Sequence, residues 1–397
     1  MRLLFAHDHR FCRGPAGEVY SAGSFPASAW DRFLEHFDQV KVIARDGGAV
    51  SANPGLARSD REGVEFEFVP SLASLRQLLV TSPALESRMC SAVESADAVV
   101  ARLPSEIGLL ALKHARRLDK PIAVEVVGCA WDSYWNTGVR GARLYAPLAY
   151  LRTRGAVARA QMALYVTSQW LQRRYPMAGP AAVASNVALE PTDEAVEAHR
   201  QTRLAALAAG KRPVLGTIGT LRVRYKGIQT VFAALARLRS SGLDLHYRIL
   251  GPGEPDSWQR MASTLGVSDL VHFDGTRSAG KDVDDWLDEI DIYLQPSFTE
   301  GLPRGMIEAM SRGAACVGST AGGIPELLPP ERLHKAGDAG ALARIIRRMA
   351  GDPAAIAGAS EADRQTARQF DPDLLTKTRS EFYAQLRNQA EKVRSSR

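Results

Sequence analysis

Two glutamates, Glu300 and Glu308, have the spacing and surroundings best suited to chemistry in this chain, eight positions apart. Glu300 follows an apolar run that predicts a strand over 291–295. Glu308 lies in a predicted helix that Pro303 can begin, because proline suits the first helical position. The apolar residues of that helix form one narrow stripe, and Glu308 points away from it. Packing of the core therefore does not explain this glutamate.

A loop carboxylate, a helix carboxylate and a helix N-terminus at the end of one strand together favour an anionic, polyhydroxylated ligand. Backbone N–H groups at the start of a helix bind phosphate. Carboxylate oxygens accept hydrogen bonds from sugar hydroxyls. A nucleotide sugar carries both kinds of group, so we expect this end of the strand to bind one.

The composition bounds the class of protein. The chain has 397 residues, which suggests about two domains, and its 45% hydrophobic and 24% charged residues are typical of a soluble globular protein. No apolar run approaches the ~20 residues of a membrane span, and the N-terminus turns polar too soon for a signal peptide. The cysteines are scattered without a Cys-x-x-Cys motif, which disfavours a disulfide framework or zinc site and fits a reducing cytoplasm; they are Cys12, Cys90, Cys129 and Cys316.

Strands and helices are expected to alternate through both halves of the chain. Strands are predicted at 3–6, 40–44, 64–69, 98–101, 122–127, 162–166, 214–218, 245–250, 271–273, 291–295 and 315–319. Helices are predicted at 29–37, 72–79, 84–95, 106–118, 143–161, 168–175, 227–240, 257–265, 283–290, 339–350 and 373–393. Alternation of this kind predicts an α/β protein with doubly wound parallel sheets, in which ligands bind at the carboxyl ends of the strands.

We expect two Rossmann-like domains. The first spans 1–189 and the second 190–372, and the amphipathic helix within 373–397 could cross back to the first. The second domain opens with a strand and a glycine-containing loop that carries three cations, Arg222, Arg224 and Lys226. Cations at a strand end would neutralise a leaving pyrophosphate, on which bond cleavage places negative charge.

The stretch from Pro296 to Gly313, continued to Glu326, resembles the Glu-x7-Glu signature of the retaining GT-B glycosyltransferases, family 4 of the group 1 transferases. The resemblance implies the GT-B fold, with two Rossmann-like domains facing across a cleft. It also implies a hexosyltransferase activity that needs no metal and no cofactor. The sugar would pass from a nucleoside-diphosphate sugar to an acceptor hydroxyl.

Within this resemblance, Glu308 would accept hydrogen bonds from the ribose and Glu300 would contact the donor sugar. The backbone N–H groups of Gly301, Leu302 and Arg304 would hold phosphate or sugar oxygens, whereas Pro303 supplies none.

Other parts of the donor site follow from the same resemblance. Lys226-Gly227 matches the family's lysine and glycine, but Thr220 stands where the family has an arginine, so either Arg222 or Arg224 would replace it. The loops that carry Gly251 and Thr276 would line the nucleotide base.

The first domain departs further from the family. Gly14 and Gly17 follow the first strand, where the family has a glycine loop that approaches the donor, and their spacing disfavours a dinucleotide dehydrogenase. No histidine follows the strand at 122–127, so Asp132 or Glu125 would assist the acceptor. His7 and His9 are expected to pack or form hydrogen bonds rather than bind a metal.

One interval is basic and rich in aromatic residues. No acidic residue lies between Asp132 and Glu190, and the region Arg140–Arg174 carries the arginines. Such a surface suits an anionic membrane, although an arginine-rich, solvated helix pair is an alternative. Nucleic acid is disfavoured because no binding motif accompanies the charge.

The first half resembles the polysaccharide-assembly branch of the family, through motifs such as Trp30-Asp-Arg-Phe-Leu and Val42-Ile-Ala-Arg45. This implies a lipid-linked saccharide acceptor in exopolysaccharide, capsule or O-antigen assembly, at the inner face of the cell membrane. Two alternatives stay open. A sugar-nucleotide 2-epimerase shares the fold and needs no acceptor, and a non-catalytic binding protein would explain Thr220 and the missing histidine.

Overall fold

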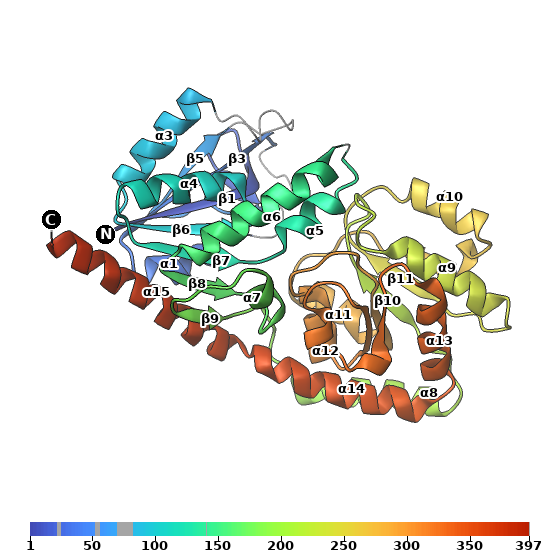
Figure 1. The fold of residues 1–397 in the computed structure, drawn as a ribbon. Coiled ribbons are helices and arrows are strands. Elements are labelled where there is room, and N and C mark those ends of the chain that lie inside the picture. Colours follow the sequence, from blue (N-terminus) through green and yellow to red (C-terminus); the bar gives the residue numbers. More distant parts are fainter. Residues whose placement is uncertain (22–24, 52–55, 70–81, 140, 397) are drawn as a thin grey trace. The chain divides into compact units, whose positions relative to one another are not determined.

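The computed structural model describes residues 1–21, 25–51, 56–69, 82–139 and 141–396, which form two compact units. Unit 1 comprises Met1–Trp135, Val139–Ala184 and Asp373–Arg397, and unit 2 comprises Asn136–Gly138 and Ser185–Pro372 (Figure 1). The domain boundaries predicted from the sequence lie after 189 and 372. The helix expected over 72–79, and Arg140, lie outside the described residues.

Unit 1 is built on a mainly parallel sheet. The order β5-β3-β1-β6-β7-β8-β9 is parallel throughout, and β2 and β4 add antiparallel pairing beside β1. Its strands are β1 (Arg2–Arg13), β2 (Val19–Ser21), β3 (Gln39–Ala49), β4 (Ala57–Arg58), β5 (Val64–Val69), β6 (Ala98–Leu103), β7 (Ile122–Val126), β8 (Met162–Tyr165) and β9 (Ala181–Val183). Its helices are η1 (Ala27–Trp30), α1 (Asp31–Leu34), α3 (Pro83–Glu94), α4 (Glu106–Arg117), α5 (Ala130–Trp135), α6 (Ala142–Ala158), α7 (Trp170–Arg174) and α15 (Pro372–Ser395).

Strand β1 is longer than the apolar run 3–6 predicts. Beyond Ala6 its register with β3 shifts, and pairing resumes with Arg10 opposite Arg45 and Phe11 opposite Asp46. The strand then turns back into β2. The continuation is stabilised by burial of Phe11, whose ring lies 5.1 Å from that of Phe66. Four consecutive polar residues, 7–10, interrupt the apolar run, so the apolar pattern alone does not predict the extension.

Unit 2 has an entirely parallel sheet in the order β12-β11-β10-β13-β14-β15. Its strands are β10 (Leu215–Ile218), β11 (Tyr247–Leu250), β12 (Val271–Phe273), β13 (Ile292–Gln295), β14 (Ala315–Ser319) and β15 (Leu333–His334). Its helices are α8 (Glu194–Ala208), α9 (Ile228–Arg239), α10 (Asp256–Thr264), η2 (Ser268–Leu270), α11 (Lys281–Asp288), α12 (Arg304–Ser311), η3 (Ile324–Glu326), η4 (Pro330–Arg332), α13 (Ala339–Ala350), α14 (Pro353–Ala367) and η5 (Arg368–Phe370).

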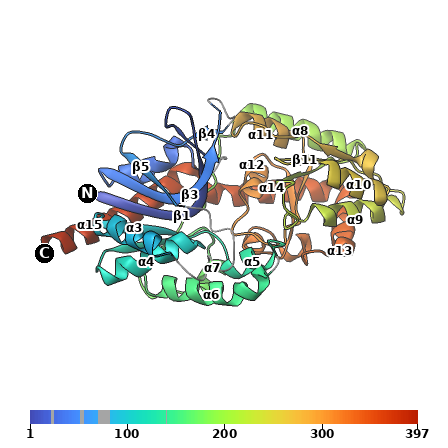
Figure 2. The ribbon, with the colours of Figure 1, turned by 90° about the horizontal axis from the view of Figure 1, so that it is seen from above.

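The strand order of unit 2 reverses direction between β10 and β13, and such a switch point is where doubly wound sheets bind ligands. The side chains of the sheet and of helices α9 and α13 form one apolar core, and these two helices lie side by side (Figures 1 and 2). The predicted α/β class with parallel sheets in two domains is confirmed.

Helix α14 was not expected from the sequence, because its many alanines give no strong apolar stripe. Asp352 caps it by accepting hydrogen bonds from the N–H groups of Ala354 and Ala355. Inside the helix, buried Asp363 accepts a 2.7 Å bond from the N–H of Cys316 in β14 and pairs with Arg332. A buried carboxylate, rather than an apolar stripe, therefore fixes α14 to the sheet.

Helix α15 follows unit 2 in the chain but packs within unit 1. The ring of Tyr383 lies 4.8 Å from that of Phe33, and Arg387 donates a 2.7 Å bond to the carbonyl of His36. The Tyr383 hydroxyl also donates to Glu125 in β7.

The buried Glu125 carboxylate has cationic neighbours on two other elements. Arg102 contacts it at 2.9 Å and Arg32 at 3.5 Å. Burial alone would raise the pKa of Glu125, but these guanidinium groups hold it at about 2. Because its oxygens already contact Arg32, Arg102 and Tyr383, Glu125 serves the packing of unit 1.

Candidate functional site

The switch point of unit 2 brings the loop after β10 against the loop after β13. Gly227, at the start of α9, has a φ of +79°, and a Cβ there would overlap the carbonyl oxygen of Pro296. The amide of Phe298 donates a 2.7 Å bond to the carbonyl of Tyr225. Glycine is therefore required for the close approach that positions Lys226 beside the second loop.

Replacing Gly227 with alanine tests this close approach. We expect a loss of about 3 kcal/mol in the free energy of unfolding, because the left-handed backbone costs about 1–2 kcal/mol and the overlap adds about as much again. Gly242 is a matched control, since its φ is also +79° but a Cβ would meet nothing within 4 Å. Urea unfolding should give Gly242→Ala only the backbone cost. Equal losses in the two variants would contradict the close approach.

Glu300 and Lys226 form an ion pair at this point, with Lys226 Nζ 2.7 Å from Glu300 Oε1. The same oxygen accepts bonds from Gln295 Nε2 at 2.9 Å and Ser297 Oγ at 2.7 Å. The Glu300 side chain is only 10% exposed. Burial works against the charge on Lys226, yet the attraction and hydrogen bond of Glu300 raise the pKa of this ammonium. The Lys226 ammonium is therefore held charged, and among the described residues no partner contacts Oε2 of Glu300.

A buried network of polar side chains holds Glu300 in place, and its members were not among the predicted site residues. The hydroxyl of Tyr293 accepts from the Ile218 N–H at 3.3 Å and donates to Gln295 Oε1 at 3.1 Å. The Ser319 hydroxyl donates a 2.6 Å bond to the Ser297 carbonyl. Polar residues at the ends of apolar strands were the available signal. Because each bond fixes the next, the network positions the Glu300 carboxylate.

Glu308 lies in α12, which begins at Arg304. Pro303 occupies the N-cap rather than the first helical position, so the helix begins one residue later than expected. The Pro303 carbonyl accepts a 3.3 Å hydrogen bond from the N–H of Ile307. Within the described part of the chain, the Glu308 carboxylate makes no hydrogen bond and no ion pair. Burial raises the pKa of Glu308, Arg304 opposes this, and Asp284 adds to it. A partly buried carboxylate without a partner is available to donors on a ligand.

The start of α12 presents backbone donors beside these carboxylates. Across the described ranges, the N–H groups of Gly301, Leu302 and Arg304 donate to no protein acceptor. The Gly301 carbonyl accepts a 2.8 Å bond from Gly323, which fixes the turn. Free N–H groups at a helix start attract anions.

The cations of the first loop differ in their surroundings. Arg222 and Arg224 are both exposed, but among the described residues only the Arg224 guanidinium lies near an aromatic ring, 5.7 Å from the centroid of Trp258. The Thr220 hydroxyl donates to the carbonyl of Pro252 at 2.9 Å. Of the loop's cations, Lys226 is the one that contacts a site carboxylate directly. Which arginine replaces the family's arginine stays a prediction.

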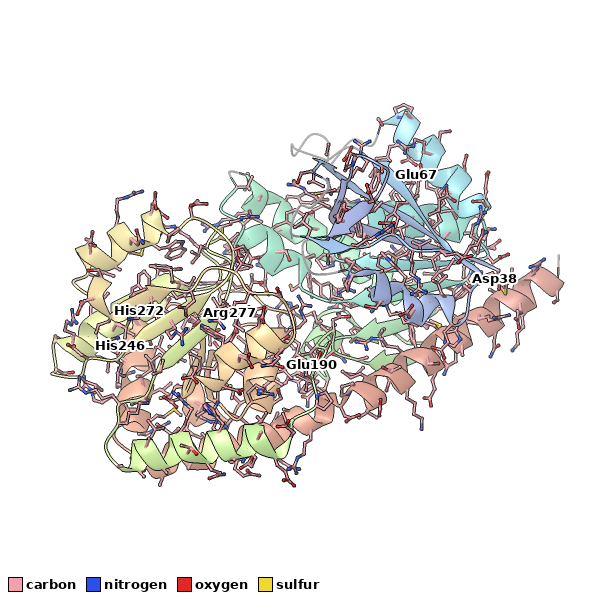
Figure 3. All side chains as sticks on the ribbon, turned by 180° about the vertical axis from the view of Figure 1, so that it is seen from behind. Asp38, Glu67, Glu190, His246, His272 and Arg277 are labelled. Atoms are coloured by element: carbon pink, nitrogen blue, oxygen red, sulfur yellow. The ribbon has the colours of Figure 1, made fainter. Side chains whose placement is uncertain are left out.

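The loops that follow β10, β11 and β12 touch one another. A Cβ on Gly251 would overlap the carbonyl oxygen of Gly219, and the Gly251 N–H donates a 2.7 Å bond to Gly275. Thr276, next in that loop, is exposed. Its neighbour Arg277 projects from the same region (Figure 3). The loops expected to line a base thus lie at the same carboxyl edge of the sheet as the loop that leads into α12.

The remaining predicted residues belong to unit 1. Gly14 and Gly17 lie in the loop of the β1–β2 hairpin, where the Gly14 N–H donates to the Glu18 carbonyl at 2.8 Å. Asp132 lies in α5 with an oxygen 3.9 Å from Arg174. Burial raises the pKa of Asp132, although Arg174 opposes it. These three residues lie in a different unit from Lys226, Glu300 and Glu308, and their roles stay predictions.

His7 and His9 are held in unit 1 by hydrogen bonds. His7 Nδ1 lies 3.1 Å from the Arg102 carbonyl, and His9 Nε2 lies 2.8 Å from Ser21 Oγ. Burial lowers the pKa of His7 to about 3 and that of His9 to about 4, so both are neutral. In unit 2, His246, directly before β11, lies beside His272 of β12 (Figure 3), with ring nitrogens 3.2 Å apart. Among the described residues, no group of three or more His, Cys, Asp or Glu side chains could hold a metal ion.

Only some side chains of the basic interval are exposed to solvent. The aromatic residues of this interval include Tyr145, Tyr165 and Tyr175, which are buried and so do not contribute to an aromatic surface. Trp135 and Arg143 are exposed. None of the helices in the described ranges is long and apolar enough to span a membrane.

Comparisons with known proteins agree with this architecture. Residues 212–352 match the family described as glycosyl transferases group 1. Protein CapJ of Staphylococcus aureus is 30% identical over 354 residues, which cover 88% of this chain and 86% of that protein. The putative colanic acid biosynthesis glycosyltransferase WcaL of Escherichia coli is 34% identical over 134 residues, which cover 30% of this chain and 32% of WcaL.

Solved structures share the fold at low identity. Sucrose-phosphate synthase from Thermosynechococcus elongatus superimposes with a TM-score of 0.67 at 17% identity, covering 97% of this chain and 98% of that one. Anabaena Alr3699/HepE, solved with UDP-glucose, gives 0.60 at 18% identity with full coverage of both chains, 100% each.

The two doubly wound units have the GT-B fold, and the family match together with the curated relatives identifies a glycosyltransferase. The chain belongs to the group 1 glycosyltransferases.

Proposed function

We propose that this protein is a retaining, metal-independent family 4 transferase that moves a hexose from a nucleoside-diphosphate sugar to an acceptor hydroxyl. The observation that carries the proposal is the Glu308 carboxylate, which has no partner among the described residues, in the helix that follows the Lys226–Glu300 pair. Both lie next to free N–H groups at a helix start. Two carboxylates and a cation around one strand end suit a ligand in which phosphates lie between two sets of hydroxyl groups.

Each residue would then have a distinct task. Glu308 accepts hydrogen bonds from the ribose hydroxyls, and Lys226, with the N–H groups of Gly301, Leu302 and Arg304, holds the diphosphate. Glu300 uses its unoccupied Oε2 to accept from a sugar hydroxyl. Gly251 and Thr276 lie along the base, and Arg222 or Arg224 adds charge near the phosphates.

The reaction breaks the bond between the anomeric carbon and the diphosphate oxygen, and the electron pair leaves with the diphosphate. The acceptor oxygen bonds to the same carbon from the same face, and its proton passes to the departing phosphate. Lys226 stabilises the negative charge that develops on the leaving group. On the acceptor side, Asp132 would take part, and Gly14 and Gly17 would let the backbone approach the donor.

Names of similar proteins support a role in polysaccharide assembly. WcaL is named for colanic acid biosynthesis, and AmsK of Erwinia amylovora for amylovoran biosynthesis. HepE was solved with UDP and with UDP-glucose. These names favour a lipid-linked saccharide acceptor in exopolysaccharide, capsule or O-antigen assembly, at the cytoplasmic face of the cell membrane.

One experiment separates transfer from the other activities of such a site. The protein is incubated with a panel of UDP-, GDP- and ADP-sugars, with and without lipid-linked saccharides and with and without EDTA. We expect acceptor-dependent release of nucleoside diphosphate that EDTA does not reduce, and NMR of the product should show the donor's anomeric configuration. An isomerised donor without release would instead identify a 2-epimerase, and binding without turnover a non-catalytic protein.

A further inference from the structure

Helix α6 exposes an unusual amount of apolar side chain. Leu144 is 86% exposed, Leu148 42% and Leu151 61%, and we call these three residues the leucine stripe. Trp135 and Val139, which precede the helix, are also exposed. Five of the eight exposed large hydrophobic residues in the described ranges thus lie within one segment. This concentration distinguishes the segment from scattered surface leucines, which need no explanation.

The leucine stripe occupies the side of α6 that the protein leaves uncovered. Its members are spaced by four and three positions, which places them on one helix face. The opposite face is also apolar, with Tyr145, Ala149 and Ala156 buried. There α6 packs on α5 and α4, and it lies on the outside of unit 1 (Figures 1 and 2). A helix that is apolar on both sides needs a second apolar environment.

The charge around the stripe indicates what that environment is. No acidic residue occurs from 133 to 189. Exposed Arg143 lies beside the stripe, with its guanidinium 5.6 Å from the Trp135 ring and its Nε donating to the Trp135 carbonyl at 3.2 Å. Arg159, just beyond the helix, is exposed as well. Apolar side chains flanked by arginine and tryptophan match the boundary between the headgroups and acyl chains of an anionic bilayer.

We propose that α6 docks unit 1 onto an anionic lipid bilayer by inserting the leucine stripe among the acyl chains, with Trp135 and Arg143 at the headgroup level. Attachment is peripheral, because only one face of the helix enters the lipid. The inference names a partner for the proposed function and rests on a lipid-linked acceptor. Binding of this helix face to lipid can be measured without any enzymatic turnover.

Vesicle flotation tests the face directly. The full chain is mixed with vesicles of phosphatidylglycerol and phosphatidylcholine, or of phosphatidylcholine alone. The triple variant Leu144→Ser, Leu148→Ser, Leu151→Ser should bind the anionic vesicles at least about tenfold more weakly, since each leucine loses its apolar burial. The control Leu265→Ser, Leu374→Ser removes exposed leucines from the C-cap of α10 and from α15 and should bind like the parent. Arg143→Glu should weaken binding to the anionic vesicles only.

The outcomes separate this inference from the proposed function. Nucleotide binding by the triple variant, measured by calorimetry, should match the parent and show that unit 2 is intact. Transfer to a water-soluble acceptor should persist while transfer to a vesicle-embedded acceptor falls. Unchanged vesicle binding would overturn the inference, as would a dimer in ultracentrifugation that the triple substitution dissociates. Stripe-dependent binding without any transfer would leave the docking face standing and remove the proposed function.

Discussion

Replacing Lys226 with methionine is expected to lower kcat about 100- to 1,000-fold, because the leaving diphosphate loses a preorganised cation. Stability should also fall, by about 3 kcal/mol, because the substitution removes one partner of a largely buried ion pair. Steady-state assays of nucleoside diphosphate release and urea unfolding measure the two effects. An unchanged kcat would remove Lys226 from the mechanism and leave it a structural partner of Glu300.

A second substitution separates the two roles of Lys226. In the double variant Lys226→Met, Glu300→Gln, the buried charge is gone, while Gln295 and Ser297 can still donate to the remaining amide oxygen. We expect most of the lost stability to return and kcat to stay low. Lys281→Met is the control, since Lys281 is 83% exposed and pairs with Asp285 only at the surface. Its effect on stability should stay within about 0.5 kcal/mol.

Glu308→Gln is expected to weaken nucleoside diphosphate binding about 10- to 100-fold, because an amide is a poorer acceptor for the ribose hydroxyls than a carboxylate. Calorimetry with UDP, GDP and ADP measures the loss. Glu331→Gln, at an exposed position of unit 2, should leave binding unchanged. Unchanged affinity of the Glu308 variant for every nucleotide would contradict the ribose assignment.

The same substitution should not destabilise the fold. Burial raises the pKa of Glu308, so the folded state holds this proton more tightly than the unfolded state does. The parent therefore loses stability as pH rises from the ordinary glutamate pKa through the raised one, and glutamine removes this loss. We expect the Tm of Glu308→Gln to equal or exceed that of the parent at about pH 7.5 and the advantage to vanish near pH 4. A large drop in Tm at neutral pH would instead indicate a structural role.

The fold class could be predicted because buried parallel strands leave short apolar runs between helices. Strand β13 and the carboxylates that follow it were found in this way, as was the glycine loop that carries Lys226. The contact between Lys226 and Glu300 was harder to foresee, because it joins residues 74 positions apart. It depends on the switch point, which appears only once the strand order is known.

Other features of the site depend on packing that a single sequence does not encode locally. Arg224 looked equivalent to Arg222, but the ring of Trp258 occupies its guanidinium. Gln295 looked like the polar end of a strand, yet it links Tyr293 to Glu300. Both outcomes arise from residues on neighbouring elements, so propensity and periodicity could not reveal them.

Helix α15 has a consequence for the order in which the protein is made. Unit 1 takes its segments from both sides of unit 2 in the chain, whereas unit 2 is nearly continuous. On the ribosome, at about 5–20 residues per second, residues 185–372 emerge before the residues that complete unit 1. Until Tyr383 is synthesised, Glu125 and the aromatic ring of Phe33 lack their last partner. The unit begun first is therefore completed last, and unit 2 can fold before the final segment of unit 1 has been synthesised.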